Sequence, residues 1–190
     1  MKCILCDSFS LNIICKECQK KHLAPSIYRD KVGDVEVISF YDFDDIKDFI
    51  HSKYEKYGSS ILKILAHNSF GVFHREFDYP NSAFLLPIDD NVINGYSHTS
   101  ILAQAFKSRK NIVLNNKLRA NNRVKYASNH LDFKINNPRD FSYHGKSGID
   151  VILVDDVVTD GVTINEAKKV LSQHGVNVLF GLVLSYSKRG

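Results

Sequence analysis

The chain has no long apolar run and no recognisable export signal. Nowhere in its 190 residues does an apolar run approach the roughly 18 residues needed to span a bilayer. The first 18 residues are interrupted by cysteines and charged residues, and they lack the apolar block of a secretory signal. We therefore expect a cytoplasmic protein without a membrane span. Internal repeats and low-complexity linkers are also absent, and the length suits one well-filled core with a small appendage.

Cysteine is absent after residue 18. The four cysteines form two C-x2-C pairs separated by eight residues: Cys3, Cys6, Cys15 and Cys18. Two such pairs can close a tetrahedron of thiolates around Zn2+, and four sulfurs leave no open position for catalysis. A disulfide framework is disfavoured without an export signal, and a redox C-x-x-C would be single and lie at a strand-to-helix junction. The pattern therefore predicts a structural zinc knuckle.

Positive charge is concentrated in one part of the chain. Residues 109–146 contain nine lysines and arginines against two acids, a charge of +7, which leaves −3 for the remainder of the +4 protein. This asymmetry suggests an anionic partner, such as phosphate groups or nucleic acid. A solvated, lysine-rich surface loop is the alternative, and the sequence leaves both open.

Strand-like and helix-like apolar patterns alternate after the cysteine pairs. The near-continuous apolar strands predict an α/β fold with a mainly parallel sheet covered on both faces. Residues 115–150 are polar and asparagine-rich without a period, which is typical of a functional or mobile segment. We expect strands at 35–43, 82–88, 112–114, 150–154 and 176–186, and helices at 42–58 (ended by Gly58), after Ser59, at 99–109, and between Gly161 and Gly175.

Two adjacent carboxylates, Asp155 and Asp156, follow the apolar strand in VILVDDVVTDGVTIN (151–165). Ligands of open α/β sheets bind at the carboxyl ends of the strands. The next turn, Thr159 to Thr163, leads into a helix, so its backbone N–H groups, its hydroxyls and the helix dipole favour a phosphate. Gly161 allows close backbone approach. Since carboxylates accept hydrogen bonds from sugar hydroxyls, the stretch predicts a ribose 5-phosphate site.

A simpler interpretation is that one aspartate caps the helix and the other is solvated. Helix caps are common and contribute about 1 kcal/mol each. A cap accounts for one acid and one hydroxyl, but not for two acids after four apolar residues together with T-x-G-x-T. The ribose 5-phosphate interpretation is therefore favoured.

VILVDDVVTDGVT resembles the signature of type I phosphoribosyltransferases, which bind 5-phosphoribosyl 1-pyrophosphate (PRPP). The resemblance implies the type I phosphoribosyltransferase fold. It implies that Asp155 and Asp156, the catalytic candidates, contact the ribose hydroxyls and that the following turn wraps the 5-phosphate. Asp160 stands where the family usually has a second threonine. The implied PRPP-binding set is Asp155, Asp156, Val157, Val158, Thr159, Asp160, Gly161, Val162 and Thr163.

With the cysteine pairs in front, the whole chain resembles the ComF (ComFC) proteins of bacterial DNA uptake. These combine a four-cysteine zinc knuckle with a phosphoribosyltransferase domain, which implies a knuckle at 1–24 and a phosphoribosyltransferase-like domain at 25–190. The family's pyrophosphate segment corresponds to 87–89 and 94–98, although its usual basic residues are missing here. The pyrophosphate candidates are Pro87, Ile88 and Asp89, with Lys117, Arg119, Arg123 and Lys125 from the basic segment.

The resemblance implies transfer of phosphoribosyl from PRPP to a nitrogen nucleophile, with Mg2+ accompanying PRPP. The alternative is a catalytically weak or inactive, PRPP-responsive module that binds single-stranded DNA. In that interpretation, aromatic residues of the basic segment either stack on bases or lie in the core: Tyr126, Phe133, Phe141 and Tyr143. The knuckle could also recruit a partner such as an uptake helicase, with 11–14 as a docking or a packing surface. The sequence does not name the acceptor base.

Overall fold

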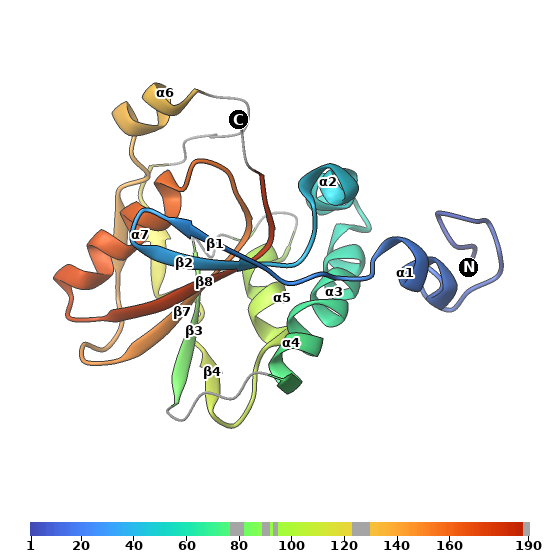
Figure 1. Ribbon diagram of the computed structural model, residues 1–190, viewed down its shortest axis with the longest axis horizontal. Helices are drawn as coiled ribbons and strands as arrows, with labels where there is room; N and C mark the ends of the chain where they lie inside the picture. Colours follow the sequence, from blue (N-terminus) through green and yellow to red (C-terminus); the bar gives the residue numbers. More distant parts are fainter. Residues whose placement is uncertain (77–81, 89–91, 93–94, 123–129, 188–190) are drawn as a thin grey trace.

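A six-stranded sheet forms the centre of the described part of the chain (Figure 1). The computed structural model describes residues 1–76, 82–88, 92, 95–122 and 130–187. The strand order is β1-β2-β8-β7-β3-β4; the β1–β2 pair is antiparallel and the other neighbouring pairs are parallel. The predicted α/β fold with a mainly parallel sheet is confirmed. The strands are β1 Tyr28–Val32, β2 Val35–Ser39, β3 Ala83–Pro87, β4 Asn111–Val113, β7 Asp150–Val158 and β8 Asn177–Tyr186.

Helices cover both faces of this sheet, as Figure 1 shows. One face packs against α2 to α5, and the other packs against α7 and a small antiparallel sheet of β5 and β6. The helices are α1 Lys16–His22, α2 Phe43–His51, α3 Gly58–Asn68, α4 Phe70–Glu76, α5 His98–Ala105, α6 Leu131–Asn136 and α7 Val162–Gln173, with a 3-10 turn η1 at Ser52–Tyr54; β5 is Leu118–Ala120 and β6 is Phe141–Tyr143.

Strand β7 lies in the middle of the sheet and is buried on both faces. Ile152 and Val154 belong to the core under α2 to α5, whereas Val151 and Leu153 belong to the core under α7. This two-sided burial accounts for the unbroken apolar run before the carboxylates, because a strand covered on both faces needs no polar alternation. The run therefore anchors the acidic pair to the centre of the sheet.

The cysteine-bearing segment packs onto the main body. Cys3, Ile14 and Leu23 are at most 1% exposed and share one apolar core with the helices α2 to α5. In Figure 1, α1 and the N-terminus lie at the end of the molecule opposite α7. Ile13 is also buried, while Leu11 is 89% exposed. Of the two interpretations of 11–14, packing therefore applies to the two isoleucines and leaves Leu11 on the surface.

Several predicted elements have different bounds. The helix predicted at 42–58 ends at His51, and Gly58 begins α3 instead of ending a helix, so that prediction was wrong. The strand predicted at 35–43 ends at Ser39, because the Asp42 side chain accepts the Asp44 N–H and starts α2. Residues 115–150, which show no period, contain β5, α6 and β6; elements of three to six residues are too short to show one.

Among the described residues, every helix falls short of the length and apolarity that crossing a bilayer requires.

Candidate functional site

The acidic pair lies inside β7, which continues to Val158 rather than ending at Val154. Asp155 pairs with Val183 of β8, so the backbone of the pair is still held by the sheet. On the other side of β7, the Ile88 N–H donates to Val154 O at 2.9 Å just after β3. The predicted segment Pro87–Ile88 therefore lies beside the strand end that carries the carboxylates. Asp89 is outside the described residues.

Asp156 is buried, and its carboxylate meets two basic side chains. Its Oδ2 lies 2.5 Å from Lys53 Nζ and 3.9 Å from His98 Nε2. Lys53 belongs to η1, and the Tyr96 hydroxyl donates to the Lys53 carbonyl at 2.7 Å, which holds this turn in place. Sequence reasoning missed Lys53, because 103 positions separate it from Asp156 and no local pattern marks it.

Burial and charge move the pKa values of the two carboxyls in opposite directions. Burial and the neighbouring negative charge of Asp156 raise the pKa of Asp155 well above its usual range, against the charge of Arg139. Burial alone would also raise the pKa of Asp156, but Lys53 and His98 outweigh it and lower that pKa. These shifts favour the ionised form of Asp156 and the protonated form of Asp155.

The turn after β7 requires a glycine at its centre. Gly161 caps α7 with φ +79°, a left-handed conformation, and a Cβ there would lie 1.8 Å from Val32 Cγ1 of β1. Sequence reasoning assigned this glycine to close approach of a ligand. The structure adds a conformational reason and a packing reason, since β1 passes directly against the turn. The side chain of Val158 is buried in the core under α7, and that of Val157 is partly buried against the core on the other face.

Asp160 does not project freely into solvent. Its Oδ2 lies 2.6 Å from Lys134 Nζ of α6, and the same ammonium donates to Thr159 Oγ1 at 3.2 Å. Its Oδ1 accepts the Val162 N–H at 3.3 Å. Burial alone would raise the pKa of Asp160, but the hydrogen bond from Lys134 outweighs it and lowers that pKa. Lys134 thus reaches the predicted phosphate turn, although sequence reasoning did not select it within the basic segment.

The four basic residues predicted to contact the pyrophosphate do not include Lys134, and the structure describes only two of them. Lys117 and Arg119 lie at the start of the small β5–β6 sheet, and Arg119 Nη2 donates to Asn116 Oδ1 at 2.6 Å. Arg123 and Lys125 are outside the described residues. Glu166 of α7 accepts the backbone N–H groups of Arg139 and Asp140, at 3.1 and 2.7 Å. This tie connects α7 to the segment that follows α6.

Among the residues that the structure describes, two clusters of side chains could hold a metal ion. Ligand atoms of His98, Asp155 and Asp156 lie within 4.8 Å of one another. Carboxylate oxygens are the protein ligands that Mg2+ prefers, so the two aspartates suit this ion, whereas the His98 nitrogen does not and Lys53 already occupies Asp156 Oδ2.

The cysteine sulfurs form the second cluster, with all four within 4.8 Å of one another. Cys6 Sγ and Cys15 Sγ are 3.7 Å apart, close to the ~3.8 Å between sulfurs in a tetrahedron with Zn–S bonds of about 2.3 Å. Backbone N–H groups point at the sulfurs, from Cys15 to Cys3 Sγ at 3.3 Å and from Cys18 to Cys15 Sγ at 3.4 Å. All four are free thiols, and the set fits a structural tetrahedral ion.

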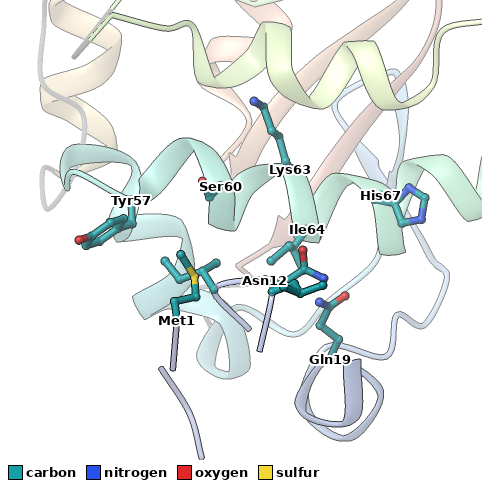
Figure 2. A pocket seen from close by; sticks show the side chains of 10 residues that line it. Met1, Asn12, Gln19, Tyr57, Ser60, Lys63, Ile64 and His67 are labelled. Atoms are coloured by element: carbon teal, nitrogen blue, oxygen red, sulfur yellow. The ribbon is translucent and has the colours of Figure 1, made fainter. Parts of the chain in front are cut away.

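A cavity of about 410 Å3 lies between the knuckle and α3, away from the carboxylates of Asp155 and Asp156. Figure 2 shows Ser60, Lys63 and His67 along α3 on one side, and Met1 and the nearby N-terminal segment on the other. Its lining residues belong to the knuckle, α1, and α3 with the turn before it. The cavity is therefore separate from the predicted ribose and phosphate site.

The aromatic residues of the basic segment divide into two groups. Phe141 and Tyr143 are each 5% exposed and lie in the core under α7, so of the two interpretations burial in the core applies to them. Phe133 of α6 is 41% exposed. Tyr126 is outside the described residues.

The structure is similar to solved structures of phosphoribosyltransferases. An adenine phosphoribosyltransferase is 16% identical, with 88% of each chain covered and a TM-score of 0.45. The enzyme from Saccharomyces cerevisiae, complexed with an imino-altritol bisphosphate and adenine, is 15% identical, with 88% of this chain and 86% of that chain covered and a TM-score of 0.40. A hypoxanthine phosphoribosyltransferase from Staphylococcus aureus is 8% identical, with 65% and 61% covered and a TM-score of 0.38. No family model and no curated protein matches the sequence.

Proposed function

We propose that the protein is a phosphoribosyltransferase-like protein that binds PRPP at the end of β7. One observation carries the proposal: a single strand–turn–helix unit presents an ionised carboxylate, a second carboxylate and a phosphate-sized turn in sequence. Asp155 and Asp156 lie near the carboxyl end of β7, and the turn from Thr159 to Thr163 leads into α7. Carboxylates accept hydrogen bonds from ribose hydroxyls, and a turn at a helix N-terminus holds a phosphate. A ribose 5-phosphate carries both of these groups.

In this proposal Asp155 and Asp156 orient the ribose. Mg2+, when bound with PRPP, would neutralise charge on the pyrophosphate, and the carboxylate of Asp155 would be its first protein ligand. The pyrophosphate would lie toward Pro87 and Ile88 beside β7, with Lys117, Arg119, Arg123 and Lys125 as candidates for covering it. The ion pair with Lys53 favours the ionised form of Asp156.

The proposed reaction is displacement at C1 of the ribose. The C1–O bond to pyrophosphate breaks with its electron pair leaving on pyrophosphate, and a lone pair on the acceptor nitrogen forms the new C1–N bond. The transition state has oxocarbenium character, so positioning and charge stabilisation contribute most of the acceleration. The proton lost from the acceptor nitrogen is taken up by the released pyrophosphate or by water.

The cellular part of the proposal rests on the resemblance to ComF proteins, which implies a role in bacterial DNA uptake. The second candidate function is that of a PRPP-responsive module binding single-stranded DNA. The charge of the basic segment and the exposed Phe133 favour it. An uptake helicase remains a candidate partner for the knuckle. The proposed cofactors are structural Zn2+ at the four cysteines and Mg2+ with PRPP.

Titration calorimetry with PRPP and Mg2+ tests the binding site. We expect wild type to bind and the variants Asp155→Asn and Asp156→Asn to bind much more weakly. Pyrophosphate release across a panel of nucleobases and other nitrogen acceptors then tests turnover. Absence of PRPP binding by correctly folded wild type would refute the proposal.

Fluorescence anisotropy with a labelled single strand tests the DNA-binding alternative. Affinity for DNA must fall as salt rises, because phosphate contacts release counterions. A salt-independent or undetectable signal would count against that function without affecting PRPP binding.

A further inference from the structure

The helix α6 has an inverted burial pattern. Its apolar residues Leu131, Phe133 and Ile135 are 47%, 41% and 59% exposed, whereas Lys134 is 3% exposed. An ordinary surface helix buries its apolar side and leaves lysine in water, and a lysine is almost never fully buried without a partner. The placement of α6 therefore follows the charge of Lys134, and that charge is directed at the turn after β7.

The Asp160 carboxylate accepts hydrogen bonds from two donors at this turn. Its Oδ1 accepts the Val162 backbone N–H at the start of α7, and its Oδ2 accepts a hydrogen bond from the Lys134 ammonium of α6. A backbone N–H at a helix N-terminus and a buried ammonium are the donors that a phosphate group uses. The side chain of Asp160 keeps 25% of its surface accessible, so it has solvent on one side. The carboxylate thus stands where an anionic ligand would stand.

We propose that Lys134 is the cation of the phosphate subsite, and that Asp160 is a placeholder anion that the ligand's 5-phosphate displaces. This inference rests on the proposed function and names a residue of that same site. A phosphate dianion carries more charge than a carboxylate and offers three acceptor oxygens, so it pairs with Lys134 and the Val162 N–H more strongly. The released Asp160 side chain turns to the solvent.

The tie between Glu166 and the backbone of 139–140 supports this role. It links α7 to the chain directly after α6, so Lys134 stays over the turn when Asp160 leaves. The arrangement also accounts for the departure from the usual threonine at position 160. A carboxylate beside a phosphate turn is tolerated because a buried lysine balances it in the unliganded protein.

Calorimetry with ribose 5-phosphate and with PRPP tests this assignment on four variants. Lys134→Gln should weaken both ligands by about tenfold or more, the usual effect of removing a hydrogen bond from a charged donor. Lys134→Arg should retain most of the affinity. Asp160→Asn should strengthen binding severalfold, because it removes the competing anion, and the Lys134→Gln penalty should persist in the Asp160→Asn background. A gain of affinity is a result that partial misfolding cannot imitate.

Lys168→Gln is the matched control, because it removes a different ion pair, between Lys168 of α7 and Asp34, and does not touch the turn. It should bind both ligands like wild type. If Lys134→Gln binds ribose 5-phosphate as tightly as wild type, the inference is wrong while PRPP binding stands. If Asp160→Asn weakens binding as much as Lys134→Gln does, the pair only shapes the turn and the inference is also wrong. If wild type binds neither ligand, the proposed function fails with it.

Discussion

Lys53 Nζ lies 2.5 Å from Asp156 Oδ2, and the two side chains are only 16% and 8% exposed. The pair joins η1, which lies between α2 and α3, to the central strand β7. Burial alone would lower the pKa of Lys53, but the charge of Asp156 raises it above its ordinary value. A buried pair of this kind compensates the desolvation of both ions only while both are present. The predicted sugar site is therefore coupled to the fold through Lys53.

Lys53→Met should destabilise the protein by about 3 kcal/mol, because it leaves the Asp156 carboxylate buried without its strongest partner. Urea denaturation at neutral pH measures this change in the free energy of unfolding. Lys47→Met is the matched control, since Lys47 forms an exposed pair with Asp44 on the neighbouring helix and should change stability by less than about 1 kcal/mol. If Lys53→Met and Lys47→Met lower the free energy of unfolding equally, burial does not make the Lys53–Asp156 pair more important for stability than the exposed pair.

The same substitution at adjacent positions should have opposite effects on stability. The pKa of Asp155 is higher in the folded than in the unfolded chain, so its contribution favours folding at low pH and is lost as pH rises through the folded pKa. At neutral pH, Asp155→Asn should therefore raise the melting temperature, and this gain should disappear below about pH 4. Asp156 has a lowered pKa and contributes stability above its unfolded pKa, so Asp156→Asn should lower the melting temperature at neutral pH.

Thermal unfolding of both variants and wild type between pH 4 and pH 8 measures these differences. Circular dichroism is a suitable signal because it does not depend on ligand binding. Destabilisation of similar size by both substitutions at neutral pH would contradict the division of the pair into one ionised and one protonatable carboxyl.

Binding of PRPP should also weaken on acidification at a higher pH than an ordinary aspartate would give. The raised pKa of Asp155 means that its carboxylate is lost first as pH falls. Calorimetric affinities measured at several pH values, compared with those of Asp155→Asn, give the contribution of this residue. The variant should show a flatter pH dependence, and an unchanged profile would assign the titration to another group.

Gly161→Ala should impair both folding and phosphate binding. The left-handed φ costs an alanine about 1 kcal/mol or more, and the new Cβ would collide with the buried Val32 side chain. Gly148→Ala isolates the first effect, since Gly148 has φ +67° with no neighbouring atom within 4 Å of an added Cβ. Chemical denaturation should show a larger loss for Gly161→Ala. If the two losses are equal, the contact between β1 and the turn has no energetic weight.

Removal of zinc should destabilise the main body of the protein as well as the knuckle. Cys3 and Ile14 are fully buried in the core that α2 to α5 share. A structural zinc site contributes its binding free energy to folding, so chelation should lower the melting temperature and added Zn2+ should restore it. Metal analysis of wild type and Cys3→Ser gives the occupancy. A melting temperature that does not respond to chelation of a zinc-loaded sample would contradict this coupling.

The sequence alone determined the features that depend on neighbouring positions. The spacing of the cysteines, the apolar run of β7 and the turn from Thr159 to Thr163 are each contained in fewer than 20 residues, so local chemistry was sufficient to predict a cluster of four cysteines and a strand–turn–helix unit, while their zinc and phosphate stay predictions. The alternation of apolar segments was likewise sufficient for a mainly parallel α/β sheet. Short elements such as β5 and β6 escaped because three residues cannot display a period.

Only the tertiary structure decided which cations reach the site. Lys53 meets Asp156 across 103 positions and Lys134 meets Asp160 across 26, and neither contact has a local pattern. The burial of Lys134 runs against the pattern of its own helix, whose apolar residues face outward. The physical reason is that a buried ion pair needs two opposite charges that the fold brings together, and these can lie far apart in the sequence. Strands, turns and cysteine pairs depend instead on the chemistry of adjacent residues.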